Sequence, residues 1–80
     1  MNRKTVVLKI PRSFLRYYKL PSDTVEVQGP EDATILDLIR LAELPEMEFG
    51  IASINGDREY LSYQPKDGQF IELHPILMGG

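Results

Sequence analysis

The stretch TILDLIRLA, residues 34–42, decides the fold because its apolar residues repeat with the period of an α-helix. One apolar face is formed by Ile35, Leu38, Ile39 and Ala42, at the spacing i, i+3, i+4 and i+7. Thr34 is a favourable N-cap, and Asp37 three residues later completes a short-armed capping box. The helix is expected to stop near Leu44, because Pro45 disfavours the helical conformation in the residue before it.

Shorter segments on both sides of this helix alternate apolar and polar residues, which indicates strands with one buried face. The expected strands cover residues 5–10, 23–28, 51–54, 58–60 and 70–74. Pro11, Gly29-Pro30 and Pro75 are expected to end three of them, since proline has no amide hydrogen to donate. Asn55-Gly56 predicts a tight hairpin, because both residues accept positive φ. Pro65 to Gly68 predicts a second turn, before the last strand.

The order strand, strand, helix, strand, short strand, strand predicts a single α+β domain over residues 1–80. The link from the second strand through the helix to the third is long enough for a crossover. Such a link places the first and last strands side by side and parallel at the centre of the sheet. The predicted architecture is a β-grasp, with a mixed sheet of four to five strands on one main helix and a flexible tail from about residue 75 to 80.

The composition limits the chemistry that the chain can perform. It contains no cysteine and one histidine, so we expect no disulfide, no thiolate ligand and no histidine metal cluster. Asp57, Glu59 and Asp67 lie in turns where acidic residues are favoured for backbone reasons, and no metal site is expected there. No apolar run approaches the roughly 18 residues of a membrane span. These features predict a soluble, cytoplasmic protein with no membrane partner.

The net charge of −3 is unevenly distributed. Residues 1–20 contain six Lys and Arg and no acid, whereas residues 21–80 contain twelve acids and three Lys and Arg. The two halves either form separate basic and acidic faces or interleave once the chain folds.

The connection over residues 12–22 mixes basic and aromatic side chains. Phe14, Tyr17 and Tyr18 have i, i+3, i+4 spacing, so a short helical turn is expected. This mixture occurs on surfaces that bind single-stranded nucleic acid, and also in loops that pack aromatic rings on a small core. The acidic remainder of the chain argues against a nucleic-acid partner.

The sequence ends on Gly79-Gly80, six residues after the last apolar strand position at Leu73. Two glycines lack a Cβ and can thread a narrow channel. A free α-carboxylate, with a pKa of roughly 3.5, is an anion that reacts poorly with nucleophiles until it is activated. We therefore expect Gly80 to be the reacting end of a substrate or carrier, with Leu77, Met78 and Gly79 recognised by a partner's groove. A frayed end, or a tail folded back on the sheet, is the alternative.

The last strand also presents a candidate partner surface. Phe70, Glu72 and His74 share its outward face, and an exposed phenylalanine is compatible with a docking patch. Cover by the connection at residues 12–21 is the alternative for Phe70. His74 is the one side chain that titrates near neutral pH, but an outward strand histidine is more often a surface residue than a catalytic one. The chain offers no convincing catalytic residue of its own.

Four motifs together point to a known family. They are Thr34 to Ile39, Ile54-Asn55-Gly56, Lys66-Asp67-Gly68 and the segment His74 to Gly80. With them the chain resembles the ThiS/MoaD sulfur-carrier proteins, which are ubiquitin-like β-grasp domains. It departs from the family at Pro65 and Gln69, where Leu-x-Asp-Gly-Asp is frequent. The bulky Leu77 and Met78 are also unusual, because the molybdopterin branch often has small residues there. The resemblance leaves the thiamine and molybdopterin branches open.

The resemblance implies a carrier rather than an enzyme, with no bound cofactor. A ubiquitin-activating-type enzyme would adenylate the Gly80 carboxylate with ATP. A sulfur donor such as a cysteine desulfurase or rhodanese would then convert it to a thiocarboxylate. An acceptor synthase would take the sulfur into the thiazole of thiamine or into molybdopterin. Two other classes stay open: a ubiquitin-like modifier joined through Gly80 to lysine, and a non-catalytic β-grasp interaction domain.

Overall fold

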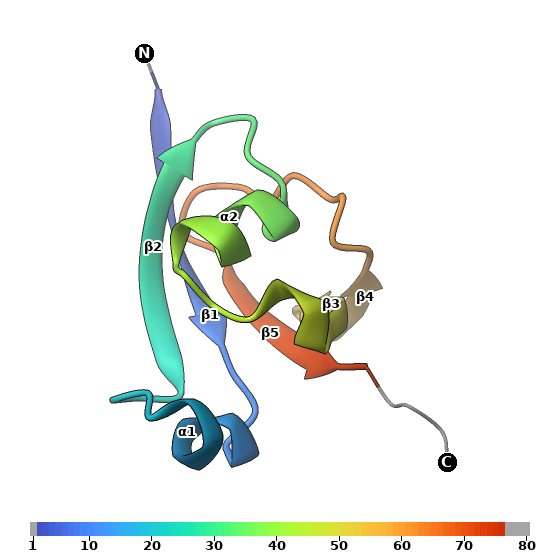
Figure 1. Cartoon of the computed structure of the whole chain (residues 1–80). Coiled ribbons are helices and arrows are strands. Elements are labelled where there is room, and N and C mark those ends of the chain that lie inside the picture. Colours follow the sequence, from blue (N-terminus) through green and yellow to red (C-terminus); the bar gives the residue numbers. More distant parts are fainter. Residues whose placement is uncertain (1, 77–80) are drawn as a thin grey trace.

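The computed structural model describes residues 2–76 and consists of a five-stranded sheet with one main helix packed on it (Figure 1). The strands are β1 (Arg3–Lys9), β2 (Thr24–Pro30), β3 (Phe49–Ile54), β4 (Asp57–Glu59) and β5 (Phe70–Pro75). The helices are α1 (Ser13–Tyr18), α2 (Ile35–Leu41) and the 3-10 turn η1 (Glu46–Glu48). The short helical turn predicted for the aromatic connection is therefore confirmed as α1.

The sheet has the order β2-β1-β5-β3-β4. β1 and β5 pair in parallel, and the other neighbouring strands pair antiparallel. The parallel pair follows from the long crossover through α2, which returns the chain to the far side of the sheet. The predicted α+β architecture, with the first and last strands as parallel neighbours, is confirmed.

The start of α2 is fixed by the predicted capping box. The Asp37 N–H donates to Thr34 Oγ1 at 3.1 Å, and the Thr34 N–H donates to Asp37 Oδ2 at 3.0 Å. These hydrogen bonds, first the one from the Thr34 backbone, lower the pKa of the Asp37 carboxyl. The cap is therefore complete above the ordinary range of a carboxyl pKa, and it is lost as the pH falls through the lowered value.

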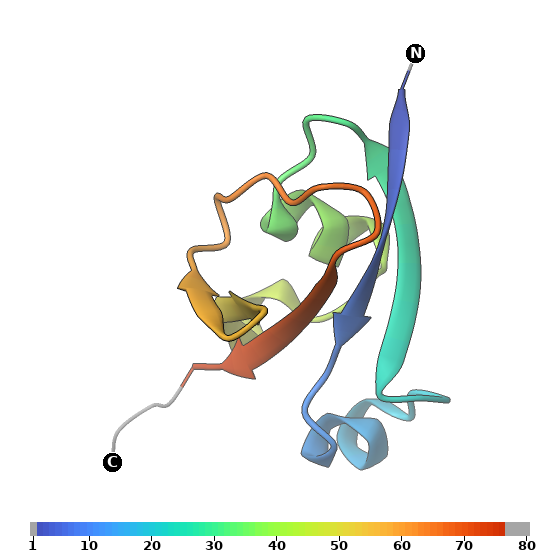
Figure 2. The ribbon, with the colours of Figure 1, turned by 180° about the vertical axis from the view of Figure 1, so that it is seen from behind.

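The core lies between α2 and one face of the sheet, and no helix within residues 2–76 covers the opposite face (Figure 2). Its α2 members are Ile35, Leu38 and Ile39, each fully buried. The strands contribute alternate residues, which are Val6, Leu8, Val27, Ala52, Ile54, Ile71 and Leu73. Phe49 is also buried, although a register shift between Phe49 and Ile51 interrupts the alternation in β3. The predicted apolar face of the helix is confirmed, with Ala42 only half-buried at its end.

Several element boundaries differ from the prediction. Gly29 and Pro30 belong to β2 instead of ending it, because β2 is an edge strand and tolerates a proline without an amide hydrogen. α2 ends at Leu41 rather than near Leu44, and the chain turns at Glu43, which has a φ of 58°. Residues 45–50, which lie between the predicted helix end and the predicted third strand, contain η1 and the first two residues of β3. β4 lies one residue earlier than predicted.

Lys4 is a buried charged residue, with only 2% of its surface exposed. Its Nζ donates to the carbonyl oxygen of Ala33 at 2.7 Å and to that of Pro65 at 2.6 Å. Burial lowers the pKa of Lys4, against the opposing effect of the Asp32 carboxylate and its neighbours. This side chain thus ties β1 to the residues before α2 and to the long loop before β5.

Candidate functional site

The three residues of the candidate partner surface, Phe70, Glu72 and His74, lie at alternate positions of β5 on the sheet face opposite α2. They point outward because they alternate along β5 with Ile71 and Leu73, which are buried. Phe70 remains 48% exposed, so the connection at residues 12–21 does not cover it. The structure brings these three side chains onto one strand face, as the sequence predicted.

Neighbouring strands extend this surface on both sides of β5. Val7 is the register partner of Phe70 in β1, and Lys9 is the partner of Glu72. On the other side, Ser53 of β3 is also a partner of Glu72. The outward face around β5 is therefore mixed, with apolar side chains at the start of the strand and polar ones further along.

His74 is held on this face by a hydrogen bond. Its Nε2 lies 2.8 Å from Ser53 Oγ, and both side chains are partly buried. A hydroxyl beside an imidazole is the first half of a nucleophile–base pair, which also needs a group that orients the ring. Within residues 2–76 the imidazole ring of His74 has no second hydrogen bond. The contact with Ser53 therefore fixes the ring in place.

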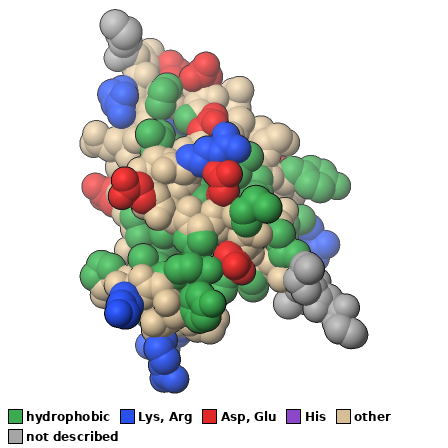
Figure 3. Space-filling model, viewed as in Figure 1, with side chains coloured by type: hydrophobic (Ala, Val, Ile, Leu, Met, Phe, Trp, Pro, Cys, Tyr) green, Lys and Arg blue, Asp and Glu red, His purple; other side chains and the backbone are tan. Residues whose placement is uncertain are grey.

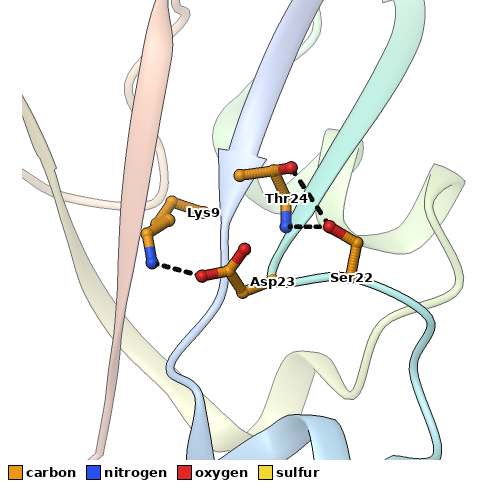
Figure 4. A network of polar contacts seen from close by, with 4 residues as sticks. All are labelled: Lys9, Ser22, Asp23 and Thr24. Atoms are coloured by element: carbon orange, nitrogen blue, oxygen red, sulfur yellow. Dashed lines mark hydrogen bonds and ion pairs between the residues drawn. The ribbon is translucent and has the colours of Figure 1, made fainter.

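The basic and acidic parts of the chain meet at the junction of α1 and β2 (Figure 4). Lys9 Nζ lies 2.7 Å from Asp23 Oδ2, and this hydrogen bond lowers the pKa of the Asp23 carboxyl. Ser22 Oγ accepts from the Thr24 N–H at 3.2 Å and fixes the turn into β2. The basic residues of the first twenty positions are thus only partly interleaved with the acidic ones. Lys9 pairs with Asp23, whereas no cation from residues 12–19 has an ion pair within residues 2–76.

The point where the chain leaves the sheet is well defined. β5 ends at Pro75, and the Ile76 N–H then donates to the carbonyl oxygen of Glu48 at 2.8 Å. A Cβ on Gly50 would lie 3.0 Å from Ile76 Cγ1, so a side chain at position 50 would press on this residue. The predicted recognition and reaction residues, Leu77, Met78, Gly79 and Gly80, lie outside the described residues.

Two solved structures have the same arrangement of strands and helix. SAMP1 from Haloferax volcanii has a TM-score of 0.69 and 23% identity, over 95% of this chain and 99% of its own. A Pyrococcus furiosus protein assigned as molybdopterin converting factor, subunit 1, has a TM-score of 0.68 and 24% identity, over 92% of this chain and 99% of its own. The fold is a ubiquitin-like β-grasp. No family model matches the sequence, and no curated protein matches it.

The likeness confirms the resemblance to the ThiS/MoaD-type β-grasp at the level of the fold. Identities of this size show the architecture alone.

The acidic residues considered for a metal site are dispersed in this β-grasp. Within residues 2–76, no three Asp, Glu or His side chains lie close enough together to hold a metal ion. Asp67 has a structural role instead, since its Oδ1 accepts from the Thr5 N–H at 2.7 Å. No helix in the same part of the chain is long and apolar enough to cross a membrane.

Two residues of the site were not predicted from the sequence. Ser53 lies beside His74 because β3 pairs with β5, and this pairing depends on the whole topology. The outward position of Ser53 was readable, because Ala52 and Ile54 on either side of it are apolar and buried. Glu48 holds Ile76 through its backbone carbonyl, and no side-chain pattern indicates such a contact.

Proposed function

We propose that this β-grasp protein is a sulfur carrier that works through the Gly80 α-carboxylate. The observation that carries the proposal is that the sequence reaches Gly79-Gly80 four residues after the end of β5, a central strand of the ubiquitin-like sheet. The Ile76 N–H donates to the carbonyl oxygen of Glu48 just after β5, and Gly80 follows Ile76 by four positions in the sequence. The fold neighbours are small carrier or modifier proteins rather than catalysts, which supports the same class.

The proposed chemistry takes place on a partner. A Gly80 carboxylate oxygen attacks the α-phosphorus of ATP, pyrophosphate leaves, and an acyl-adenylate forms. The terminal sulfur of a persulfide on a cysteine desulfurase or rhodanese then attacks the acyl carbon and displaces AMP. A thiol reduces the resulting acyl disulfide and releases the thiocarboxylate. An acceptor synthase of thiamine or molybdopterin biosynthesis then receives the sulfur.

In this scheme the chain's own residues bind and position the reacting end. A closed channel that holds the carboxylate in line with ATP supplies much of the rate, and a side chain at position 79 or 80 would obstruct it. Leu77 and Met78 are the apolar anchors in that channel, and the face with Phe70 is the docking surface for the activating enzyme or synthase. The proposal assigns the protein to the cytoplasm, without a nucleic-acid or membrane partner.

A second candidate is a ubiquitin-like protein modifier. The fold likeness to SAMP1, a small archaeal modifier, favours it. A modifier needs the same acyl-adenylate, and differs only in that a lysine amine finally attacks the Gly80 acyl group to give an amide. A plain β-grasp interaction domain is the third class, and it would need neither glycine.

The test is intact mass spectrometry of the full chain after incubation with ATP, magnesium, an adenylating enzyme and a sulfide source. We expect the mass to rise by the difference between one sulfur and one oxygen, and a variant that lacks Gly80 to stay unchanged. The mass before reaction establishes that Gly80 carries the free carboxylate. Circular dichroism of the deletion variant controls for folding.

Two outcomes would contradict the carrier. A branched peptide that joins Gly80 to a lysine of a target protein would identify the modifier. If the mass is unchanged although the enzyme is active on another carrier, the interaction domain is the remaining candidate. Binding that survives deletion of Gly80 would then support that third class.

A further inference from the structure

A groove of about 290 Å3 opens between α1 and η1, and no residue of β5 lines it. Its lining residues are Ser13, Phe14, Tyr17, Tyr18 and Glu48. Figure 3 shows hydrophobic side chains gathered over this end of the molecule, with Lys and Arg side chains below them. The volume is at the lower limit for small-molecule sites, which span about 300–1,000 Å3. It suits one large apolar side chain better than a cofactor.

The aromatic lining is preformed. The Phe14 ring stacks on the buried Phe49 with centroids 5.3 Å apart, and it also contacts Tyr18 at 5.6 Å. Tyr17 packs edge-on against Tyr18 at 4.8 Å. Through these contacts the core orders the aromatic rings before any ligand arrives, which reduces the entropy lost on binding.

Apolar surface nevertheless stays uncovered at the rim of the groove. Tyr17 is 79% exposed, and Met47 on the adjoining η1 is 83% exposed. Exposed tyrosines next to a packed aromatic floor are the residues that most often contribute binding energy in interfaces. The groove therefore has the composition of a docking site for a partner.

The charge at this end of the molecule indicates the chemistry of the ligand. Arg12, Arg16 and Lys19 are exposed, and none forms an ion pair within residues 2–76. Two other cations, Lys9 and Arg40, do have carboxylate partners. The Glu48 carboxylate also lines the groove, but the three unpaired cations on and beside α1 outnumber it. The cations are complementary to an acidic segment, because opposite potentials speed encounter and select the partner.

Glu48 connects this groove with the end of β5. On the groove side Glu48 lines the groove together with Tyr18, and burial together with the Glu48 carboxylate raises the pKa of Tyr18. On the other side its carbonyl accepts from the Ile76 N–H. A protein that binds the residues after Ile76 is therefore placed next to the groove.

We propose that the groove binds an apolar side chain carried on an acidic segment of the protein that handles the C-terminal glycines. The identity of the partner rests on the proposed function, whereas the ligand chemistry of the groove rests on the aromatic lining and the unpaired cations. The groove is thus a second contact, separate from the sheet face around Phe70.

The probe is a peptide with one phenylalanine flanked by aspartate and glutamate, titrated into the full chain and followed by amide NMR shifts. We expect the largest shifts at residues 13–18 and at Glu48. Tyr17→Ala is expected to weaken binding about tenfold or more, as for a residue that dominates an interface. Tyr60→Ala is the matched control, because Tyr60 is 76% exposed and lies outside the groove, and it should bind as the unchanged protein does.

The charge contribution is tested in the same titration. Arg16→Glu should weaken binding and reduce its dependence on salt, whereas Arg58→Glu on β4 should do neither. A peptide with alanine in place of phenylalanine should lose most of its affinity. Equal binding by Tyr17→Ala and Tyr60→Ala, or shifts centred on Phe70, would overturn the proposal.

Other occupants give different results. Shifts at residues 13–18 that depend on protein concentration without peptide would assign the groove to a second copy of this chain. Binding of single-stranded oligonucleotides in preference to the peptide would assign it to nucleic acid. Either result would overturn the acidic-segment proposal.

The experiments distinguish failure of the groove proposal from failure of the carrier proposal. A variant without Gly80 should still bind the peptide, although it forms no thiocarboxylate. In the adenylation assay, Tyr17→Ala should raise the KM for the carrier with little change in kcat, as expected for lost binding. An unchanged KM would exclude the groove from activation and leave the Gly80 chemistry intact.

Discussion

The Leu38→Ala variant is expected to lose about 2–5 kcal/mol of unfolding free energy, as is usual for deletion of a buried leucine. Leu38 is fully buried at the centre of α2, where it packs on the sheet. Its Cδ2 occupies the space beside Gly29, where a Cβ would approach it to 2.8 Å. Truncation leaves a cavity that β2 cannot fill from Gly29. Urea unfolding followed by circular dichroism measures the change.

Leu41→Ala on the same helix is the matched control. Leu41 is largely exposed, so its truncation should change the unfolding free energy by well under half of the Leu38 effect. Similar losses of unfolding free energy for the two variants would mean that the wrong face of α2 has been assigned to the core.

The main helix was predictable because its signals agree with one another. The apolar spacing, the Thr34 N-cap and the Asp37 carboxylate all assign the same start, and the structure contains the reciprocal hydrogen bonds that they imply. Alternation along β5 was equally informative, since the parity of Ile71 and Leu73 determines that Phe70 points outward. Local periodicity thus predicted the part of the candidate site that lies on β5, which is Phe70, Glu72 and His74.

Features that depend on distant pairing could not be predicted in this way. Pro30 was expected to end its strand, but it lies on the edge of the sheet, and only the complete strand order identifies an edge. The groove could not be predicted from the sequence for the same reason. The spacing of Phe14 and Tyr17 predicted α1, but the opposite wall comes from Glu48, about thirty residues later in the chain. The sequence therefore predicted the aromatic side of the groove without indicating that a groove exists.

Lys4 is a charged residue that lies on the buried face of β1, as the alternation of its strand indicates. It has the same parity as Val6 and Leu8, so alternation places it inward, and the structure buries it. In the sequence it is only one of the six basic residues of residues 1–20, and its burial was not predicted, since lysine is rarely buried without partners. Its partners are the carbonyls of Ala33 and Pro65, and no side-chain motif indicates a backbone acceptor.

The Lys4→Met variant is expected to lose about 2–4 kcal/mol of unfolding free energy, because two buried carbonyls lose their donor. Methionine keeps the apolar stem, so the loss reports on the amino group and its hydrogen bonds to Ala33 and Pro65. The loop before β5 depends on one of these bonds. Urea unfolding measures the loss, and amide exchange near Pro65 should speed up.

Lys66→Met is the control, because Lys66 is exposed and its substitution should leave the unfolding free energy nearly unchanged. The pH dependence gives a second readout with a definite sign. Burial lowers the pKa of Lys4 from its ordinary value of 10.5, so the unfolded chain binds a proton more tightly than the folded one. The contribution of Lys4 to stability should therefore rise as the pH increases from the lowered pKa to the ordinary one. Lys4→Met should remove this rise and Lys66→Met should retain it. Identical pH profiles in both variants would mean that Lys4 is hydrated rather than bonded to the two carbonyls.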